Sequence, residues 1–174
     1  MTASTIKSTQ ISNAETVPVT LSTAPKSGGK CRQWTATIEV PTTSTDEVGD
    51  IIKMIRVPAN LVPTKVTVFN DDLDSHSTPT LAADAGMYRS DTGAVILATG
   101  LATAITTLQA ANTTGVNVMT EAHDIADIGK TMWELAGLTA RPDYMIDIAF
   151  TITATAATGA AGTVSMIIEG ALSN

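Results

Sequence analysis

The sequence predicts an all-β fold: an antiparallel, jelly-roll-like β-sandwich with one or two short helices and an extended N-terminal arm. The 174 residues include 30 threonines, which favour strands, and little of the Leu, Glu and Lys composition typical of helices. Seven or eight short segments of strand type are separated by turn signals, which favours a sandwich over alternating βαβ units. Only 3% of the residues are aromatic, so Val, Ile, Leu, Met and Ala must form the core.

The chain length suits one domain of roughly 150 residues with an additional arm. We assign residues 1–32 to the arm and residues 33–174 to the sandwich. The arm is rich in Ser and Thr, is interrupted by prolines and by the pair Gly28-Gly29, and has the composition of a short strand only from Val17 to Leu21. Such a segment becomes ordered mainly against something else.

Three strands are predicted at the start of the sandwich. Gln33 to Val40 alternates apolar and polar residues and ends at Pro41. Residues 50–57 (DIIKMIRV) are richer in apolar residues, which predicts a more central position in the sheet, and residues 64–70 (TKVTVFN) form the third strand.

The middle of the chain changes period. In residues 100–111, Leu101, Ile105 and Leu108 fall on one face of a helix, so we expect a helix there. Trp133 is expected to anchor a second helical segment in the core. The remaining predicted elements are a weaker strand, a short strand and one or two helical turns, at residues 80–89, 116–120 and 129–138 respectively.

Two strands are predicted at the C-terminal end. From Tyr144 to Thr153 every second residue is large and apolar, and Asp147 lies on the opposite, wetter face. Gly162 to Gly170 repeats the alternation. The small residues from Thr155 to Ala161 predict a turn that joins the two strands as a hairpin.

The charge is unevenly distributed along the chain. Residues 1–33 contain four cationic residues and Glu15, a net charge of +3, whereas the rest of the chain carries −10. The overall charge of −7 argues against nucleic-acid binding, which needs clustered Lys and Arg. A basic arm can lie along its own acidic body or a neighbouring one; the composition is equally consistent with a solvated tail.

Several classes of protein are excluded by absent features. The single cysteine, Cys31, permits neither an intrachain disulfide nor a cysteine-built zinc site. There is no apolar run of about 18 residues to cross a membrane and no apolar stretch of a secretory signal at the N-terminus. We therefore expect a protein made in a cytoplasm, without a cofactor and without a membrane partner.

Two clusters contain side chains of the types that bind ions or act in catalysis. Asp72, Asp74 and His76 have the spacing of the first ligands of a calcium loop, but the glycine and glutamate that an EF-hand requires are missing, which favours a solvated turn. His123 and Asp124 resemble a base with its partner carboxylate, yet no nucleophile motif accompanies them.

Cys31, between Lys30 and Arg32, is either a reactive or an incidental thiol. We expect no enzymatic activity.

Two turn-and-strand patterns carry a resemblance to a known family. Val48 to Pro58 contains a Gly-Asp pair followed by a strand and a proline, and Gly129 to Leu138 contains Gly-Lys, Trp-Glu and Gly-Leu before Pro142. Together they resemble a group of small tailed-phage proteins that act as capsid cement or decoration proteins. The similarity covers roughly residues 34–170, and the segment Ala83 to Tyr88 departs from the Asp-x-Gly-Tyr-like strand of the group.

The resemblance implies a virion protein on the capsid exterior, assembled as a trimer, whose arm grips the major capsid protein. An extended arm can add a strand to a sheet edge, and repetition over a shell multiplies weak contacts. The arm residues expected to contact the capsid are Lys7, Val17, Val19, Leu21, Lys26, Lys30 and Arg32. The alternative is a fibre or adhesin-type module that recognises a host-surface glycan or protein; the chain has two Trp and two Tyr, which are few for a sugar site.

Overall fold

Two antiparallel four-stranded sheets face each other in the computed structural model of the chain, which describes residues 31–120 and 124–173. Sheet 1 has the strand order β1-β8-β3-β6, and sheet 2 has the order β2-β7-β4-β5. In chain order the strands are β1 (Cys31–Val40), β2 (Ile51–Val57), β3 (Leu61–Asn70), β4 (Ala82–Arg89), β5 (Val95–Ile105), β6 (Asn112–Asn117), β7 (Ile146–Ala154) and β8 (Gly162–Leu172).

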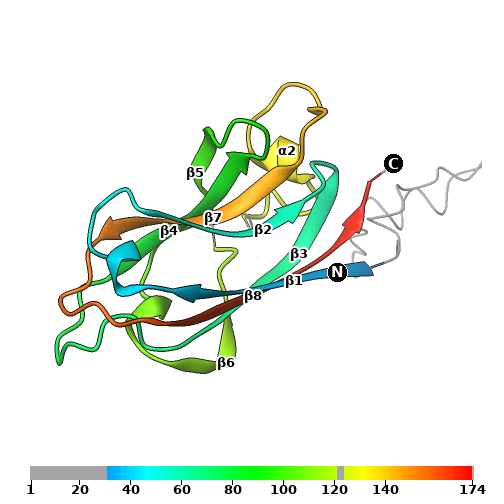
Figure 1. Cartoon of the computed structure of the whole chain (residues 1–174). Helices are drawn as coiled ribbons and strands as arrows, with labels where there is room; N and C mark the ends of the chain where they lie inside the picture. The colour runs from blue at the N-terminus through cyan, green and yellow to red at the C-terminus, as the bar shows by residue number, and fades with distance from the viewer. Residues whose placement is uncertain (1–30, 121–123, 174) are drawn as a thin grey trace, which may run out of the picture.

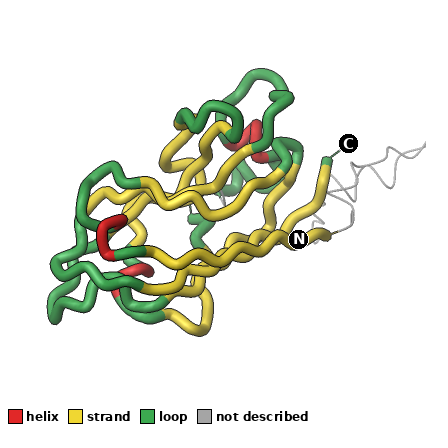
Figure 2. Tube along the Cα trace, in the orientation of Figure 1, coloured by secondary structure: helices red, strands yellow, loops and turns green. Residues whose placement is uncertain are grey.

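Every connection except that between β4 and β5 carries the chain from one sheet to the other. This is the strand order of a jelly roll, in which two sheets bury their inner faces against each other. Figure 1 shows the two layers, and Figure 2 shows that the helical segments are short and lie in the connections. The predicted jelly-roll-like sandwich is confirmed.

The core follows from the alternation that the sequence displays. On β8, Val164, Met166 and Ile168 are fully buried, while the residues between them are half-buried. Because successive side chains of a strand point to opposite faces, these residues meet the buried face of the opposite sheet. On β7 the same period buries Ile146, Ile148, Phe150 and Ile152.

The predicted C-terminal hairpin is wrong. β7 pairs with β2 and β4 in sheet 2, whereas β8 pairs with β1 and β3 in sheet 1, so the residues between them form an arch from sheet to sheet. The predicted central position of residues 50–57 is also wrong, because β2 is an edge strand. Alternation reports burial of a face and does not report which strand is the neighbour.

The helix predicted at residues 100–111 is a strand followed by one 3-10 turn. β5 runs through Leu101 and Ala102, both fully buried, and the 3-10 helix η3 covers Thr107–Gln109. The register of β5 against β4 shifts three times, and three consecutive residues, 100–102, are buried. Such bulges interrupt the period of two and produced the helix-like spacing.

The helical segment near Trp133 is confirmed as α2 (Met132–Leu135). Glu134 accepts the backbone N–H of Thr131 at 2.7 Å, as in a capping box. Met132 is fully buried, and Trp133 packs against the core, in agreement with its predicted role as an anchor. None of the helices in the described part of the chain has the length and apolar character needed to cross a membrane.

Candidate functional site

The side chain of Asp74 ties two connections together. It lies between β3 and β4, is 1% exposed and accepts four hydrogen bonds from backbone N–H groups. Thr80 and Leu81 donate to Oδ2 at 2.7 and 3.0 Å, Ala157 donates to Oδ2 at 3.0 Å, and Thr158 donates to Oδ1 at 2.9 Å. The carboxylate therefore fastens the entrance of β4 to the arch between β7 and β8.

These donors keep Asp74 ionised. Burial by itself would raise the pKa of the carboxyl group, but the four backbone N–H groups together lower the pKa well below its usual range. The segment is thus no solvated turn at Asp74, in contrast to the prediction.

Asp72 and His76 do not join Asp74 around a common ion position. Asp72 Oδ1 accepts the backbone N–H of Asp74 at 2.9 Å. The exposed His76 accepts the backbone N–H of Thr78 on Nδ1 at 3.1 Å. Among residues 31–120 and 124–173, no three His, Cys, Asp or Glu side chains are grouped so as to hold a metal.

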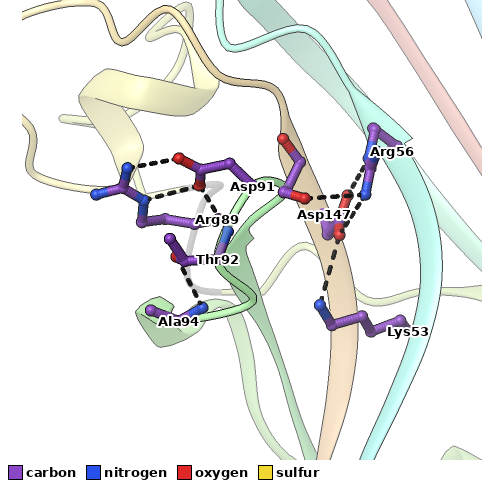
Figure 3. Close-up of polar contacts among 8 residues, drawn as sticks. Lys53, Arg56, Arg89, Asp91, Thr92, Ala94 and Asp147 are labelled. Carbon is purple, nitrogen blue, oxygen red and sulfur yellow. Dashed lines mark hydrogen bonds and ion pairs between the residues drawn. The ribbon is translucent and has the colours of Figure 1, made fainter.

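A second buried carboxylate, Asp147, joins β7 to β2 (Figure 3). Arg56 donates from Nε to Oδ1 at 2.6 Å and from Nη2 to Oδ2 at 3.0 Å, and Lys53 Nζ lies 3.6 Å from Oδ2. The side-chain hydrogen bonds of Arg56 lower the pKa of Asp147 despite its burial. The same guanidinium donates to the backbone carbonyl of Ser90 at 3.3 Å, so it also holds the turn after β4.

The alternation of residues 144–153 predicts a wetter face for Asp147, but its side chain is buried, and this ion pair is not evident from the sequence. The available signal was two cations, Lys53 and Arg56, on one predicted strand, and an isolated aspartate within another. Pairing of β2 with β7 brings Arg56 opposite Asp147 in register. A nearby pair on the surface, Arg89 and Asp91, is formed within a single turn.

The side of the sandwich where β1 meets β2 is open and apolar. Both are edge strands, and a groove of about 260 Å³ runs between them. Ile38 on β1 is 37% exposed and Ile51 on β2 is 47% exposed, although both are large aliphatic residues. Val40 and Pro41 also line the groove. Exposed aliphatic groups that adjoin in this way mark a surface suited to contact with another segment.

Most of the arm residues predicted to bind the capsid fall outside the described residues: Lys7, Val17, Val19, Leu21, Lys26 and Lys30. Arg32 was predicted to belong to the arm, but β1 begins at Cys31. Arg32 is therefore an exposed residue of this strand and lies opposite Gly170 on β8. His123 also lies outside the described residues. Asp127, four residues after His123 in the sequence, accepts a hydrogen bond from Lys130 Nζ at 2.5 Å. Cys31 is exposed at the start of β1.

The fold of this chain is similar to that of chains in two solved phage capsid structures. No protein-family profile and no curated protein matches the chain. A chain of the cyanophage Pam1 capsid asymmetric unit is 23% identical, with a TM-score of 0.59 over 83% of this chain and 86% of that one. A chain of the capsid of Ralstonia phage GP4 is also 23% identical, with a TM-score of 0.61 over 84% and 86% of the two chains. The predicted resemblance to phage head proteins is confirmed at the level of the fold.

Proposed function

We propose that the protein is a structural component of a phage virion, a cement or decoration subunit that binds the major capsid protein on the outside of the head. The observation that carries this proposal is the shared fold, which extends over more than four fifths of this chain and of each capsid chain it matches. The sequence patterns of Val48 to Pro58 and Gly129 to Leu138 point to the same class of protein.

The polar groups of the sandwich support a structural role. Asp74 and Asp147 are the two buried carboxylates among the described residues. Backbone N–H groups surround Asp74, and Arg56 and Lys53 pair with Asp147. Each one joins segments that are distant in the sequence. In this part of the chain, buried charge serves to fix the two sheets and their connections.

Attachment to the shell is assigned to the N-terminal arm and to the strand that follows it. The arm carries Lys7, Lys26 and Lys30 and leads directly into β1, an edge strand with an exposed surface. Lysines favour contact with an acidic surface, and an extended backbone can add to a sheet edge. Assembly as a trimer gives three such arms on one body, so that individually weak contacts act together.

Binding to shells that lack the protein tests this proposal. The variant to use is a deletion of residues 1–30, because a deletion of residues 1–32 would remove the first two residues of β1. We expect a folded sandwich, seen by circular dichroism and thermal unfolding, that no longer cosediments with shells. Unchanged occupancy of the shells would overturn attachment through the arm.

Point variants of the full chain give a second test. Charge reversal at Lys7, Lys26 and Lys30 should weaken shell binding, whereas Lys65→Glu, at an exposed position of β3, should not. Sedimentation of the purified protein reports the trimer, and a monomer at all concentrations would contradict it. Specific binding of the protein to a host glycan, without binding to shells, would favour the adhesin-type alternative.

A further inference from the structure

The turn at residues 124–130, just before α2, presents two aliphatic side chains to solvent. Ile125 is 89% exposed and Ile128 is 69% exposed, the two highest values for large hydrophobic residues in the described part of the chain. The backbone N–H of Ile128 donates to the carbonyl of Asp124 at 3.2 Å, so the segment makes one helix-like turn. Residues three apart lie on the same side of such a turn, which places both isoleucines on one surface.

Hydrogen bonds hold the 124–130 turn in a fixed shape. The carbonyl of Asp124 also accepts the backbone N–H of Asp127 at 2.8 Å, and Lys130 Nζ donates to Asp127 Oδ1 at 2.5 Å. Gly129 has a φ of +84°, the left-handed conformation in which the chain reverses direction. A preformed segment loses little conformational entropy on binding, so this turn is suited to contact another surface.

The groove between β1 and β2 has the composition and the size to receive an aliphatic side chain. Ile38, Val40 and Ile51 are among the residues that line it, and its volume is about 260 Å³. An apolar cavity of roughly 150 Å³ already holds a molecule as large as benzene. The groove therefore has room for an isoleucine side chain.

The charges beside the turn and beside the groove are complementary. The turn has an acidic residue, Asp124, at one end and a basic residue, Lys130, at the other. The groove has the basic residue Lys53 on its β2 side and the acidic residue Glu39 on its β1 side. Each lysine remains 44% exposed despite its ion pair within the chain. A turn that crosses the groove with Asp124 toward β2 meets an opposite charge at each end, which fixes its orientation.

The turn and the groove lie at opposite ends of the sandwich. Ile51 is the first residue of β2, whereas Trp133 of α2 donates its backbone N–H to the carbonyl of Ala59, beyond the last residue of β2, at 3.1 Å. The seven residues of β2 span roughly 20 Å. Figure 1 shows α2 near the end of β2 and away from the connection between β1 and β2. The turn of one chain is therefore too far from the groove of the same chain, and a neighbouring chain must supply the contact.

We propose that the 124–130 turn of one chain inserts Ile125 and Ile128 into the β1–β2 groove of a second copy, and that this contact repeats around a closed ring of three chains. A contact between two different surfaces of one molecule is heterologous, and such contacts form a ring when the rotation closes. The ring size rests on the trimer of the proposed function, whereas the contact itself does not.

Cysteines placed on the two surfaces of the full-length chain test the contact. In a Cys31→Ser background, Ile38→Cys and Ile128→Cys place one thiol in the groove and one on the turn, at opposite ends of the chain. With Ile128 toward β1, mild oxidation should link each chain to the next, and a non-reducing denaturing gel should show covalent dimers and trimers. The matched control is Val116→Cys with Ile128→Cys, which places the first thiol on β6 at the other edge of sheet 1 and should remain monomeric.

The products distinguish the possible arrangements. A covalent trimer without free thiols is the expected end point of the oxidation. Covalent dimers alone would indicate an isologous, two-fold contact, and a ladder beyond three chains would indicate an open filament; either result would overturn the ring. Absence of cross-links in folded protein would overturn the contact.

Sedimentation of variants without added cysteines gives an independent readout. Ile125→Asp should raise the protein concentration at half assembly by at least about tenfold, because the contact would place a carboxylate in an apolar groove. Val116→Asp changes another exposed aliphatic residue and should leave that concentration unchanged. Equal shifts in the two variants, with folding checked by circular dichroism, would contradict the proposed surface. Binding to shells is a separate measurement: a ring that does not bind shells would refute the cement role and leave this contact standing.

Discussion

Asp147 on β7 and Arg56 on β2 form a two-point ion pair, with Nε–Oδ1 and Nη2–Oδ2 distances of 2.6 and 3.0 Å. The aspartate side chain is 7% exposed, whereas the arginine is 54% exposed. The pair therefore joins a buried carboxylate of a central strand to a cation of the edge strand beside it. Loss of this pair should therefore destabilise the protein mainly through Asp147, because a buried carboxylate cannot replace the hydrogen bonds of Arg56 with bonds to water.

The substitution Asp147→Asn should destabilise the sandwich. The buried amide cannot accept both hydrogen bonds from Arg56, so we expect a loss of about 1–3 kcal/mol in the free energy of unfolding. Asp91→Asn is the matched control, because Asp91 forms an equally short pair with Arg89 at the surface, where such pairs contribute about 0–1 kcal/mol. Urea unfolding of the two variants gives both values. Equal losses would contradict the difference in burial.

Much of the fold was predictable because the sequence alternates where one face of a strand is buried. Val164, Met166 and Ile168 illustrate this, since each is apolar, each is separated by one residue and each is fully buried. The prolines that end two predicted strands, Pro41 and Pro58, also lie immediately beyond β1 and β2. Local patterns of this kind depend on the backbone geometry of a single strand.

The parts that could not be predicted depend on partners distant in the sequence. Nothing in the segment around Asp147 indicates that Arg56, 91 residues away, is its neighbour. Asp74 is similar: its donors at Ala157 and Thr158 belong to an arch that the sequence suggests only as a turn. The bulges of β5 likewise follow from its path over β4 and imitate a helical period.

Asp74→Asn should be more harmful than Asp72→Asn. The asparagine amide would turn an N–H group toward backbone donors, which leaves at least one buried donor without an acceptor. We expect a loss of about 2–5 kcal/mol for Asp74→Asn, since several hydrogen bonds to a charged group are affected. Asp72→Asn retains the oxygen that accepts the backbone N–H of Asp74 and should change stability by about 0.5 kcal/mol or less. Thermal unfolding compares the two, and similar melting temperatures would refute the assigned role of Asp74.

Gly86→Ala tests the close passage of β5 over β4. A methyl group at Gly86 would collide with the backbone carbonyl of Ala98, and a rigid backbone cannot yield as a flexible side chain does. We expect a loss of about 1–3 kcal/mol or more together with faster hydrogen exchange of the β5 amides.

Gly137→Ala is the control for this prediction. Gly137 has a φ of +72° and nothing within 4 Å of an added Cβ. This substitution should lower the free energy of unfolding by about 1–2 kcal/mol through backbone strain alone. Hydrogen exchange of the β5 amides should then be no faster than the lower overall stability of that variant explains. If both variants showed the same exchange pattern, the contact between Gly86 and Ala98 would not be the cause.

Stability should fall in acid, mainly because of Asp74. The folded pKa values of Asp74 and Asp147 are both lowered, whereas an aspartate in the unfolded chain has a pKa of about 3.9. The unfolded state therefore binds more protons at low pH, so the stabilisation is complete above about pH 5 and is lost as the pH falls below about 4. Urea midpoints measured from pH 7 to pH 2 should be level at first and then decline. Asp74→Asn should flatten this decline at any salt concentration.

The pKa of exposed Asp91 is lowered to about 2 by Arg89, so Asp91→Asn should flatten the decline only at low salt, where surface charges are not screened. An acid profile identical in the Asp74→Asn variant and the unsubstituted protein would show that this carboxylate does not govern the acid response.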